Sequence, residues 1–253
     1  MSQPAFSALE PLPFELVFDD GEPMETEADV RQLYLLRDVT ARAMWERGRP
    51  DFYASGNVFV YYSLEQARDV AAKRPYFRGP DFFFVNGVPG HAREGWVSWW
   101  EGGRLPDLIV EFLSPSTEKV DRKDKMDLYA RVFRTREYFL YDLDRPWILE
   151  GYRLAGESYQ PMQLNSRGRF HSEVLGFDLG VWHGMAWLVY PHTGLEGDWL
   201  RLFDADGRMV PQAALAQAEE AQARLDSERE RAEAAEAELE RLRSLLGERS
   251  GQG

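Results

Sequence analysis

Hydrophobic and polar positions recur with a helical period in two N-terminal segments of the chain. Apolar residues follow Thr26 at helical spacing, so we expect a helix over residues 27–47 with Thr26 at its N-cap. A shorter helix is expected over residues 64–73, because Ser63 is a residue type that caps helix N-termini. Glu65 lies early in this second helix, where its charge suits the helix dipole.

Short runs of β-branched and aromatic residues predict buried strands between and after these helices. The runs cover residues 57–62, 80–85, 96–100, 106–113 and 138–142. The clearest strand is 106–113, and a turn after it leads into a helix expected over residues 120–133. Short strands with Gly, Asn and His turns predict an antiparallel extension over residues 147–203. Strand, helix and strand in succession favour an α/β or α+β body.

The sequence pattern changes at about Pro211, where a stretch rich in Ala, Glu, Arg, Leu and Gln begins. Its apolar positions fall into heptads, namely Ala218, Leu225, Ala232, Leu239 and Leu246, joined by Ala221, Ala235 and Leu242, with a break at Glu228. A coiled coil and a solvated single helix both fit this pattern, and we favour self-association. The predicted organisation is an irregular lead-in (1–24), a globular domain (25–208) and a helical tail (211–248).

Composition narrows the range of functions. The absence of cysteine excludes disulfides, thiolate zinc sites and cysteine nucleophiles. The first residues lack the features of a signal peptide, and no apolar run approaches the roughly 18 residues that cross a bilayer. We therefore expect a soluble, cytoplasmic protein without a membrane partner. The four histidines show no paired spacing for zinc, and neither a Walker-type loop nor a GxSxG motif is present.

The charge of the chain is −13, which argues against a general nucleic-acid coat. One basic segment stands out, residues 119–136, with seven basic side chains against three acidic ones. The basic side chains are Lys119, Arg122, Lys123, Lys125, Arg131, Arg134 and Arg136. Such a segment fits either an enzyme that touches DNA at a single place or an ordinary solvated helix.

Two carboxylates and a lysine carry the candidate chemistry. Asp81 and Glu111 lie on separate predicted strands, and Lys125 lies on the helix that follows. Phosphodiester hydrolysis needs a cation that polarises the phosphoryl oxygen and activates water. Mg²⁺ takes oxygen ligands from one or two carboxylates, and a nearby lysine can stabilise the transition-state charge. These residue types favour a nuclease that uses Mg²⁺ or Mn²⁺.

Each of these residues has a competing interpretation. Asp107 competes with Asp81 as the first ligand, because residues four apart on a strand share a face and Asp107 lies four before Glu111. Glu111 interrupts an apolar run, and a buried carboxylate needs a cationic partner. Lys125 could instead form only an i, i+4 pair with Asp121.

The sequence resembles the Uma-type restriction endonucleases, a bacterial family of the PD-(D/E)XK superfamily. The resemblance is carried by Pro106-Asp107-Leu108-Ile109-Val110-Glu111-Phe112-Leu113-Ser114-Pro115-Ser116-Thr117, then Asp121, Lys125, Tyr129, Glu137-Tyr138 and Asp142. Residues 57–63, residues 78–83 and the heptad-like tail are similar to the longer members. The similarity covers about residues 20–205, and the ordered series of matches is what makes it specific.

The resemblance implies a restriction-endonuclease-like core, with a central mixed sheet flanked by helices and a divalent-metal site. Asp81 matches the first acidic position and Glu111 the second. The sequence departs from the superfamily pattern at Leu113, where a lysine is usual, and Lys125 on the next helix takes the lysine's place. The main-chain carbonyl of Phe112 is expected as a further metal ligand.

The resemblance also implies an endonuclease acting on DNA, with further residues around the site. Glu27, Asp107 and Asp121 are candidate additional acids, although Glu27 also fits a plain charge at a helix N-terminus. Lys119, Arg122 and Lys123 are expected to contact nucleic acid, and Lys119 or Lys123 could replace Lys125. A homodimer through the C-terminal helix is expected. The alternative is a non-catalytic protein that keeps the nuclease fold and acts in DNA binding or assembly through its tail.

Overall fold

The structure is a computed structural model that describes residues 12–18, 26–74, 77, 79–186, 194–213, 224–231 and 234. The chain divides into two compact units, Met1–Val210 and Pro211–Gly253. The described strands lie in the first unit, and they are β1 Phe52–Ser55, β2 Val60–Tyr61, β3 Phe82–Asn86, β4 Trp96–Val97, β5 Leu108–Phe112, β6 Glu137–Tyr141, β7 Leu149–Ala155, β8 Ser158–Pro161, β9 Phe170–Ser172, β10 Phe177–Ala186 and β11 Leu195–Phe203. Its helices are α1 Glu27–Glu46, α2 Leu64–Ala71 and a continuous helical segment made of α3 Glu118–Val120, the π-helix η1 Asp121–Lys125, α4 Met126–Leu128 and the π-helix η2 Tyr129–Phe133.

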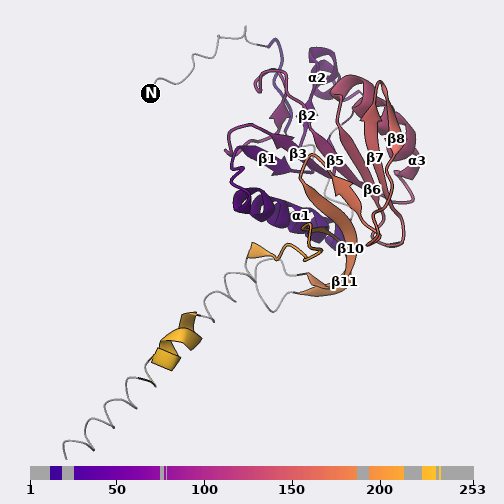
Figure 1. The fold of residues 1–253 in the computed structure, drawn as a ribbon. Helices are drawn as coiled ribbons and strands as arrows, with labels where there is room; N and C mark the ends of the chain where they lie inside the picture. The colour runs from indigo at the N-terminus through magenta and orange to yellow at the C-terminus, as the bar shows by residue number, and fades with distance from the viewer. Residues whose placement is uncertain are drawn as a thin grey trace, which may run out of the picture. The chain divides into compact units, whose positions relative to one another are not determined.

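The centre of the first unit is a mixed six-stranded sheet in the order β1-β3-β5-β6-β7-β8 (Figure 1). Only β5 and β6 run parallel, and the helical segment 118–133 connects them; the other neighbours are antiparallel. An antiparallel sheet, β11-β10-β9, and a short parallel pair, β2-β4, complete the unit. The architecture is therefore mixed α+β, as the sequence pattern predicts, with the central mixed sheet that the family resemblance implies.

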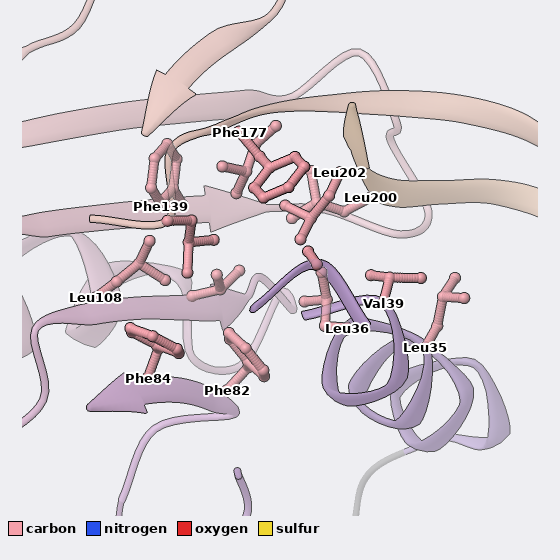
Figure 2. Close-up of a cluster of buried hydrophobic side chains, with 14 of the residues drawn as sticks. Leu35, Leu36, Val39, Phe82, Phe84, Leu108, Phe139, Phe177, Leu200 and Leu202 are labelled. Carbon is pink, nitrogen blue, oxygen red and sulfur yellow. The ribbon is translucent and has the colours of Figure 1, made fainter. Parts of the chain in front are cut away.

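The side chains of the central strands alternate between two hydrophobic cores. Phe82 and Phe84 of β3 belong to a core formed with α1 and the second sheet, as does Leu108 of β5. In Figure 2, Leu36 and Val39 of α1 point toward Leu200 and Leu202 of β11 across this core. The intervening residues, Phe83 and Ile109, face a second core that includes Tyr129 and Phe133 of η2. The period of two thus assigns odd-numbered positions of β3 and β5 to the face covered by the segment 118–133.

A buried glutamine joins α1 to the edge strand β11. The side-chain nitrogen of Gln32 donates to the carbonyl of Leu200 at 3.1 Å, and the Leu200 N–H donates to Gln32 Oε1 at 2.8 Å. Gln32 is completely buried, and β11 is an outer strand of its sheet. The amide side chain therefore satisfies both backbone groups of Leu200 as a neighbouring strand would.

The three helices expected in the globular domain are present, and the first two have the expected caps. Thr26 accepts from the Asp29 N–H at the start of α1, and Ser63 accepts from the Gln66 N–H at the start of α2. The helical segment after β5 runs from Glu118 to Phe133, two residues longer at its start than expected.

Two expected strands are shorter in the structure. The predicted strand 57–62 contains only β2, and β1 precedes it as a separate strand that was not expected. The chain turns between them because Asn57 has a φ of 51° and Gly56 lies against the carbonyl of Asp81, where a Cβ would come within 1.8 Å. Likewise, only the first two residues of 96–100 form a strand, and a turn follows.

In the second unit, the described residues 224–231 are helical, and the heptad position Leu225 is 60% exposed. Besides Glu228, the other heptad positions lie outside the described residues, so the coiled coil and the homodimer stay predictions. Among the described residues, none of the helices combines the length and the apolar character that a membrane crossing requires.

We predict that Gln32→Leu lowers the free energy of unfolding by about 2–4 kcal/mol, because it leaves the buried N–H and C=O of Leu200 without partners. Urea denaturation followed by circular dichroism measures the loss. Ala41→Leu, at an exposed position of the same helix, is the control and should change stability by less than about 0.5 kcal/mol. Equal stability of Gln32→Leu and wild type would contradict the assigned role of Gln32.

Candidate active site

The pairing of β3 with β5 brings Asp81 and Glu111 together. Phe82 pairs with Val110 and Phe83 with Ile109 in an antiparallel register, so residue 81 falls opposite residue 111. The Asp81 N–H donates to Glu111 Oε2 at 3.2 Å, and the Phe112 N–H donates to Asp81 Oδ2 at 2.7 Å. The two carboxylates therefore meet where β5 ends and β3 begins.

The helical segment adds a lysine and a tyrosine to this pair. Lys125 Nζ lies 3.1 Å from Glu111 Oε2 and 2.8 Å from Asp121 Oδ1. The Tyr129 hydroxyl donates to Glu111 Oε1 at 2.5 Å. Both oxygens of Glu111 are thus held by side chains of one helix face, and Asp121 lies on the other side of the lysine.

The π-helical turns explain how residues four apart stay aligned. In an α-helix of 3.6 residues per turn, positions i+4 and i+8 drift from position i by about 40° and 80° around the axis. A π-helical turn is wider, which reduces this drift, and π segments occur often at functional sites. η1 covers Asp121 to Lys125, and Tyr129 begins η2.

An ion-pair network fastens the start of this helical segment to the central sheet. Glu118 pairs with Arg122 at 3.0 Å and with Arg145 at 3.1 Å. Arg122 also reaches Glu150 of β7 at 2.6 Å, and Arg145 reaches Asp142 after β6 at 2.6 Å. These contacts fix where the helix begins and therefore where its lysine and tyrosine lie.

The cluster is buried at its centre, and two of its residues are partly exposed. Glu111 and Asp121 are almost completely buried. Asp81 is partly exposed, and the Lys125 side chain is 19% exposed. A ligand from solvent would therefore meet Asp81 and Lys125 first.

Burial and like charge shape the protonation of the cluster. Burial raises the pKa of Asp81 well above its usual value, and the adjacent charge of Glu111 raises it further. Burial also raises the pKa of Asp121. Burial alone would lower the pKa of Lys125, but Glu111, Asp81 and Asp121 together raise it above its usual value, so the lysine stays charged. Burial and Glu111 raise the pKa of Tyr129, so its hydroxyl stays a donor.

The charges of the cluster do not balance within the protein. Asp81, Glu111 and Asp121 surround a single ammonium, that of Lys125. If all four groups were ionised, two negative charges would be left without a counter-charge. Bound protons or one divalent cation would offset them.

The donor set fits a hard divalent cation. Carboxylate oxygens are the ligands that Mg²⁺ prefers, and Mg²⁺ usually takes one or two of them and keeps several waters. Within the described part of the chain, no three Asp, Glu, His or Cys side chains gather as a group that could hold a metal ion. The candidate metal ligands are therefore two carboxylates, Asp81 and Glu111, because Asp121 is paired with Lys125.

The competing carboxylate, Asp107, lies at the other end of β5. Four residues along a strand separate it from Glu111, about 13 Å. Its Oδ2 accepts from the Asn86 N–H at 2.8 Å, and Arg104 and Arg136 lie 3.5 and 3.4 Å from its carboxylate. The structure thus brings Asp81, and not Asp107, against Glu111.

The remaining candidate residues lie outside this cluster. Glu27 is 71% exposed and pairs with Arg31 at 2.6 Å, within the first turns of α1. Lys119 and Lys123 are exposed on the helical segment. Arg122 is held by two carboxylates, so its charge is already compensated. For Phe112, the structure gives a contact of the amide with Asp81, and the ligand role of its carbonyl stays a prediction.

Two groups of the cluster had no assigned role in the sequence. One is the Tyr129 hydroxyl, which donates to Glu111. Its position eight residues after Asp121, on the same helix face, is the sequence feature that could have placed it in the cluster. The other is the Phe112 amide, which had no signal because any residue supplies a backbone N–H.

The first unit is a mixed α+β domain with a central mixed sheet, and two acids and a lysine lie together at one end of that sheet. Residues 11–187 match the model of the Uma2 family, whose description reads "Putative restriction endonuclease", and the chain belongs to this family. A crystal structure described as "a putative nuclease belonging to DUF820 from Anabaena variabilis ATCC 29413" is similar over 61% of this chain and 77% of that one, at 13% identity and a TM-score of 0.43. The comparison with curated proteins gave no match.

We predict that Asp81→Asn stabilises the metal-free protein at neutral pH, by about 1 kcal/mol as is common for stabilising changes at functional sites. The raised pKa of Asp81 means that the folded state holds a proton that the unfolded state has lost, so stability falls as pH rises from about 4 toward that pKa. An asparagine removes this loss, because its carbonyl can still accept from Phe112 and its NH₂ can donate to Glu111.

Thermal unfolding in EDTA at pH 5 and pH 8 measures the effect, which should be larger at pH 8. Asp107→Asn is the matched control, since its carboxylate lies beside two arginines and its replacement should not stabilise the protein. A destabilised Asp81→Asn at pH 8 would show that the two carboxylates do not repel each other.

Proposed function

We propose that this protein is a divalent-metal-dependent endonuclease that hydrolyses phosphodiester bonds in DNA. The observation that carries the proposal is a cluster of three carboxylates around one lysine: Glu111 and Asp121 pair with Lys125, and Asp81 lies against Glu111, so the cluster has more negative than positive charge. Membership of the restriction-endonuclease family supports phosphodiester hydrolysis as the reaction.

Asp81 and Glu111 would hold Mg²⁺ or Mn²⁺, with the carbonyl of Phe112 as the further ligand expected from the sequence. When bound, the cation supplies the charge that polarises a phosphoryl oxygen and activates water. Asp81 is partly exposed as a residue, and its Oδ2 accepts from the Phe112 N–H, which fixes the orientation of the carboxylate.

Lys125 and Tyr129 would prepare the site from the helical segment. The Lys125 ammonium stays charged and partly exposed, so it can stabilise the negative charge that develops on the phosphate and orient the attacking water. Tyr129 donates to the Glu111 oxygen that Lys125 does not contact, and such hydrogen bonds fix the orientation of a metal-binding carboxylate.

The substrate backbone would meet the exposed lysines of the same segment. Among the described residues, no carboxylate lies within ion-pair distance of Lys119 or Lys123, so both charges are free to contact phosphates. Arg122 would act mainly by holding the helix against Glu150. A small number of phosphate contacts is consistent with the overall charge of −13, because extensive contact with phosphates requires many basic side chains.

We predict that the protein nicks plasmid DNA with Mg²⁺ or Mn²⁺ and that Asp81→Ala and Glu111→Ala each lower the rate by more than about 100-fold, the usual cost of losing a transition-state interaction. Agarose-gel assays measure the rate, and EDTA should abolish it. Asp107→Ala, at the far end of β5, is the control and should keep activity.

Calorimetry with Mn²⁺ separates this proposal from the non-catalytic alternative. A wild-type protein that binds DNA without binding Mn²⁺ would overturn the nuclease proposal and favour a DNA-binding or assembly role.

We predict that Lys125→Met keeps Mn²⁺ binding while it lowers the cleavage rate by about 100-fold or more. Removing the ammonium leaves Asp81, Glu111 and Asp121 with an even greater need for a cation, so the metal should bind at least as tightly. Calorimetry and cleavage assays give the two readouts. Lys123→Met, an exposed lysine two residues away, should change cleavage far less. Loss of Mn²⁺ binding in Lys125→Met would show that the lysine organises the site instead of acting on the phosphate.

A further inference from the structure

The loop that joins β6 to β7 lies at the same edge of the sheet as the two carboxylates. β5 and β6 are parallel, so Glu111 and Tyr141 are both near the ends of their strands at this edge. Tyr141 pairs with Phe112 on one side and with Leu149 on the other, which places residues 142–148 beyond this edge. From β3 to β7 there are three strand spacings, about 14 Å.

This loop displays Trp147, the most exposed large hydrophobic side chain in the described part of the chain, at 78%. The loop itself is held firmly. The Asp142 N–H donates to the Ile148 carbonyl at 3.1 Å, and the Ile148 N–H donates to the Arg145 carbonyl at 2.7 Å. Asp142 Oδ1 also accepts from the amides of Asp144 and Arg145. An indole presented on a tight, hydrogen-bonded loop loses little conformational freedom when a partner covers it.

The β6–β7 loop contacts the helical segment that carries two exposed lysines. Arg145 of the same loop pairs with Glu118 at the start of the helical segment, next to Lys119 (Figure 1 shows β6, β7 and α3 on one side of the molecule). Lys119 and Lys123 are exposed on that segment. Proteins that bind single-stranded nucleic acid combine exposed aromatic rings, on which bases stack, with cations that contact the backbone, and here Trp147 supplies the ring while Lys119 and Lys123 of the neighbouring segment supply the cations.

We propose that Trp147 stacks on an unpaired base of the substrate strand, a few nucleotides from the bond that meets Asp81 and Glu111. This inference rests on the proposed nuclease function and adds a preference for DNA with unpaired bases, such as single strands or junctions, over the fully paired DNA that the enzyme would also cut. In an intact duplex the bases stack on one another, and extruding one costs a few kcal/mol, so the indole discriminates against fully paired DNA.

The test measures binding of the full chain in EDTA to a fluorescein-labelled single-stranded oligonucleotide and to the duplex of the same sequence. Trp147→Ala should weaken single-strand binding about 10-fold, the effect of losing one stacked base, and leave duplex binding unchanged. Trp147→Phe should retain most of the single-strand affinity, because it keeps an aromatic face.

Trp45→Ala is the matched control. Trp45 is 73% exposed at the end of α1, and the nearby Arg49 bonds to Asn86 at the end of β3 that is remote from Asp81. Its loss should leave both affinities at the wild-type level.

The outcomes separate the two proposals. Wild-type binding to the single strand with equal binding by Trp147→Ala overturns the stacking role and leaves the nuclease proposal standing. Equal weakening of single-strand and duplex binding also overturns it, because stacking on an unpaired base cannot act on a duplex. A wild-type protein that binds neither oligonucleotide overturns the DNA-directed function together with this inference.

Discussion

The site depends on one constraint: two carboxylates are forced against each other inside the protein by the register of an antiparallel strand pair. Asp81 and Glu111 cannot separate without breaking the ladder between β3 and β5. Their repulsion is offset by the Lys125 ammonium and the Tyr129 hydroxyl, both delivered by one helical segment. The adjacent charge of Glu111 adds to burial in raising the pKa of Asp81, so the protonation of the cluster follows from how the strands pair.

The hydrophobic cores keep this unfavourable arrangement in place. On one face, α1 and the second sheet bury Phe82 and Leu108, and on the other face Tyr129 and Phe133 bury Phe83 and Ile109. A one-residue slip of β3 against β5 would turn the side chains of β3, Phe82 and Phe83 among them, to the wrong face, and the lost burial opposes any such shift. Stability is thus supplied by packing on both faces of the sheet, and the site occupies the edge where packing ends.

The helical segment 118–133 connects the sheet edge that carries the carboxylates to β7 and the β6–β7 loop. Its first turn is fastened to β7 and to the β6–β7 loop through Glu118, Arg122 and Arg145. The same contacts that fix Lys125 therefore also fix Trp147 and the exposed lysines relative to the carboxylates. A nucleic-acid strand that crossed this edge would meet an aromatic ring, free cations and the carboxylate pair in a fixed geometry.

The sequence by itself determined the helices and most of the central strands, and it predicted the residue types of the candidate site. Local periodicity and caps such as Thr26 and Ser63 specify helices, because those signals act over a few residues. The interruption of an apolar strand by Glu111 marks a carboxylate that needs a partner, since burial without one is costly. The spacing of Asp121, Lys125 and Tyr129 places their side chains on one helix face, and the family pattern supplied the pairing with Asp81.

Only the tertiary structure decided which residues meet. The choice between Asp81 and Asp107 depends on the register of β3 against β5, which no local signal encodes, because three Pro-Asp dipeptides look alike in the sequence. The break between β1 and β2 depends on the close approach of Gly56 to the Asp81 backbone, a contact between distant segments. The compensation of Arg122 by Glu150, 28 residues away, likewise follows from the fold. Each of these contacts joins segments that are distant in the sequence. Local signals in the sequence fit more than one set of contacts, and only packing in the folded chain selects among them.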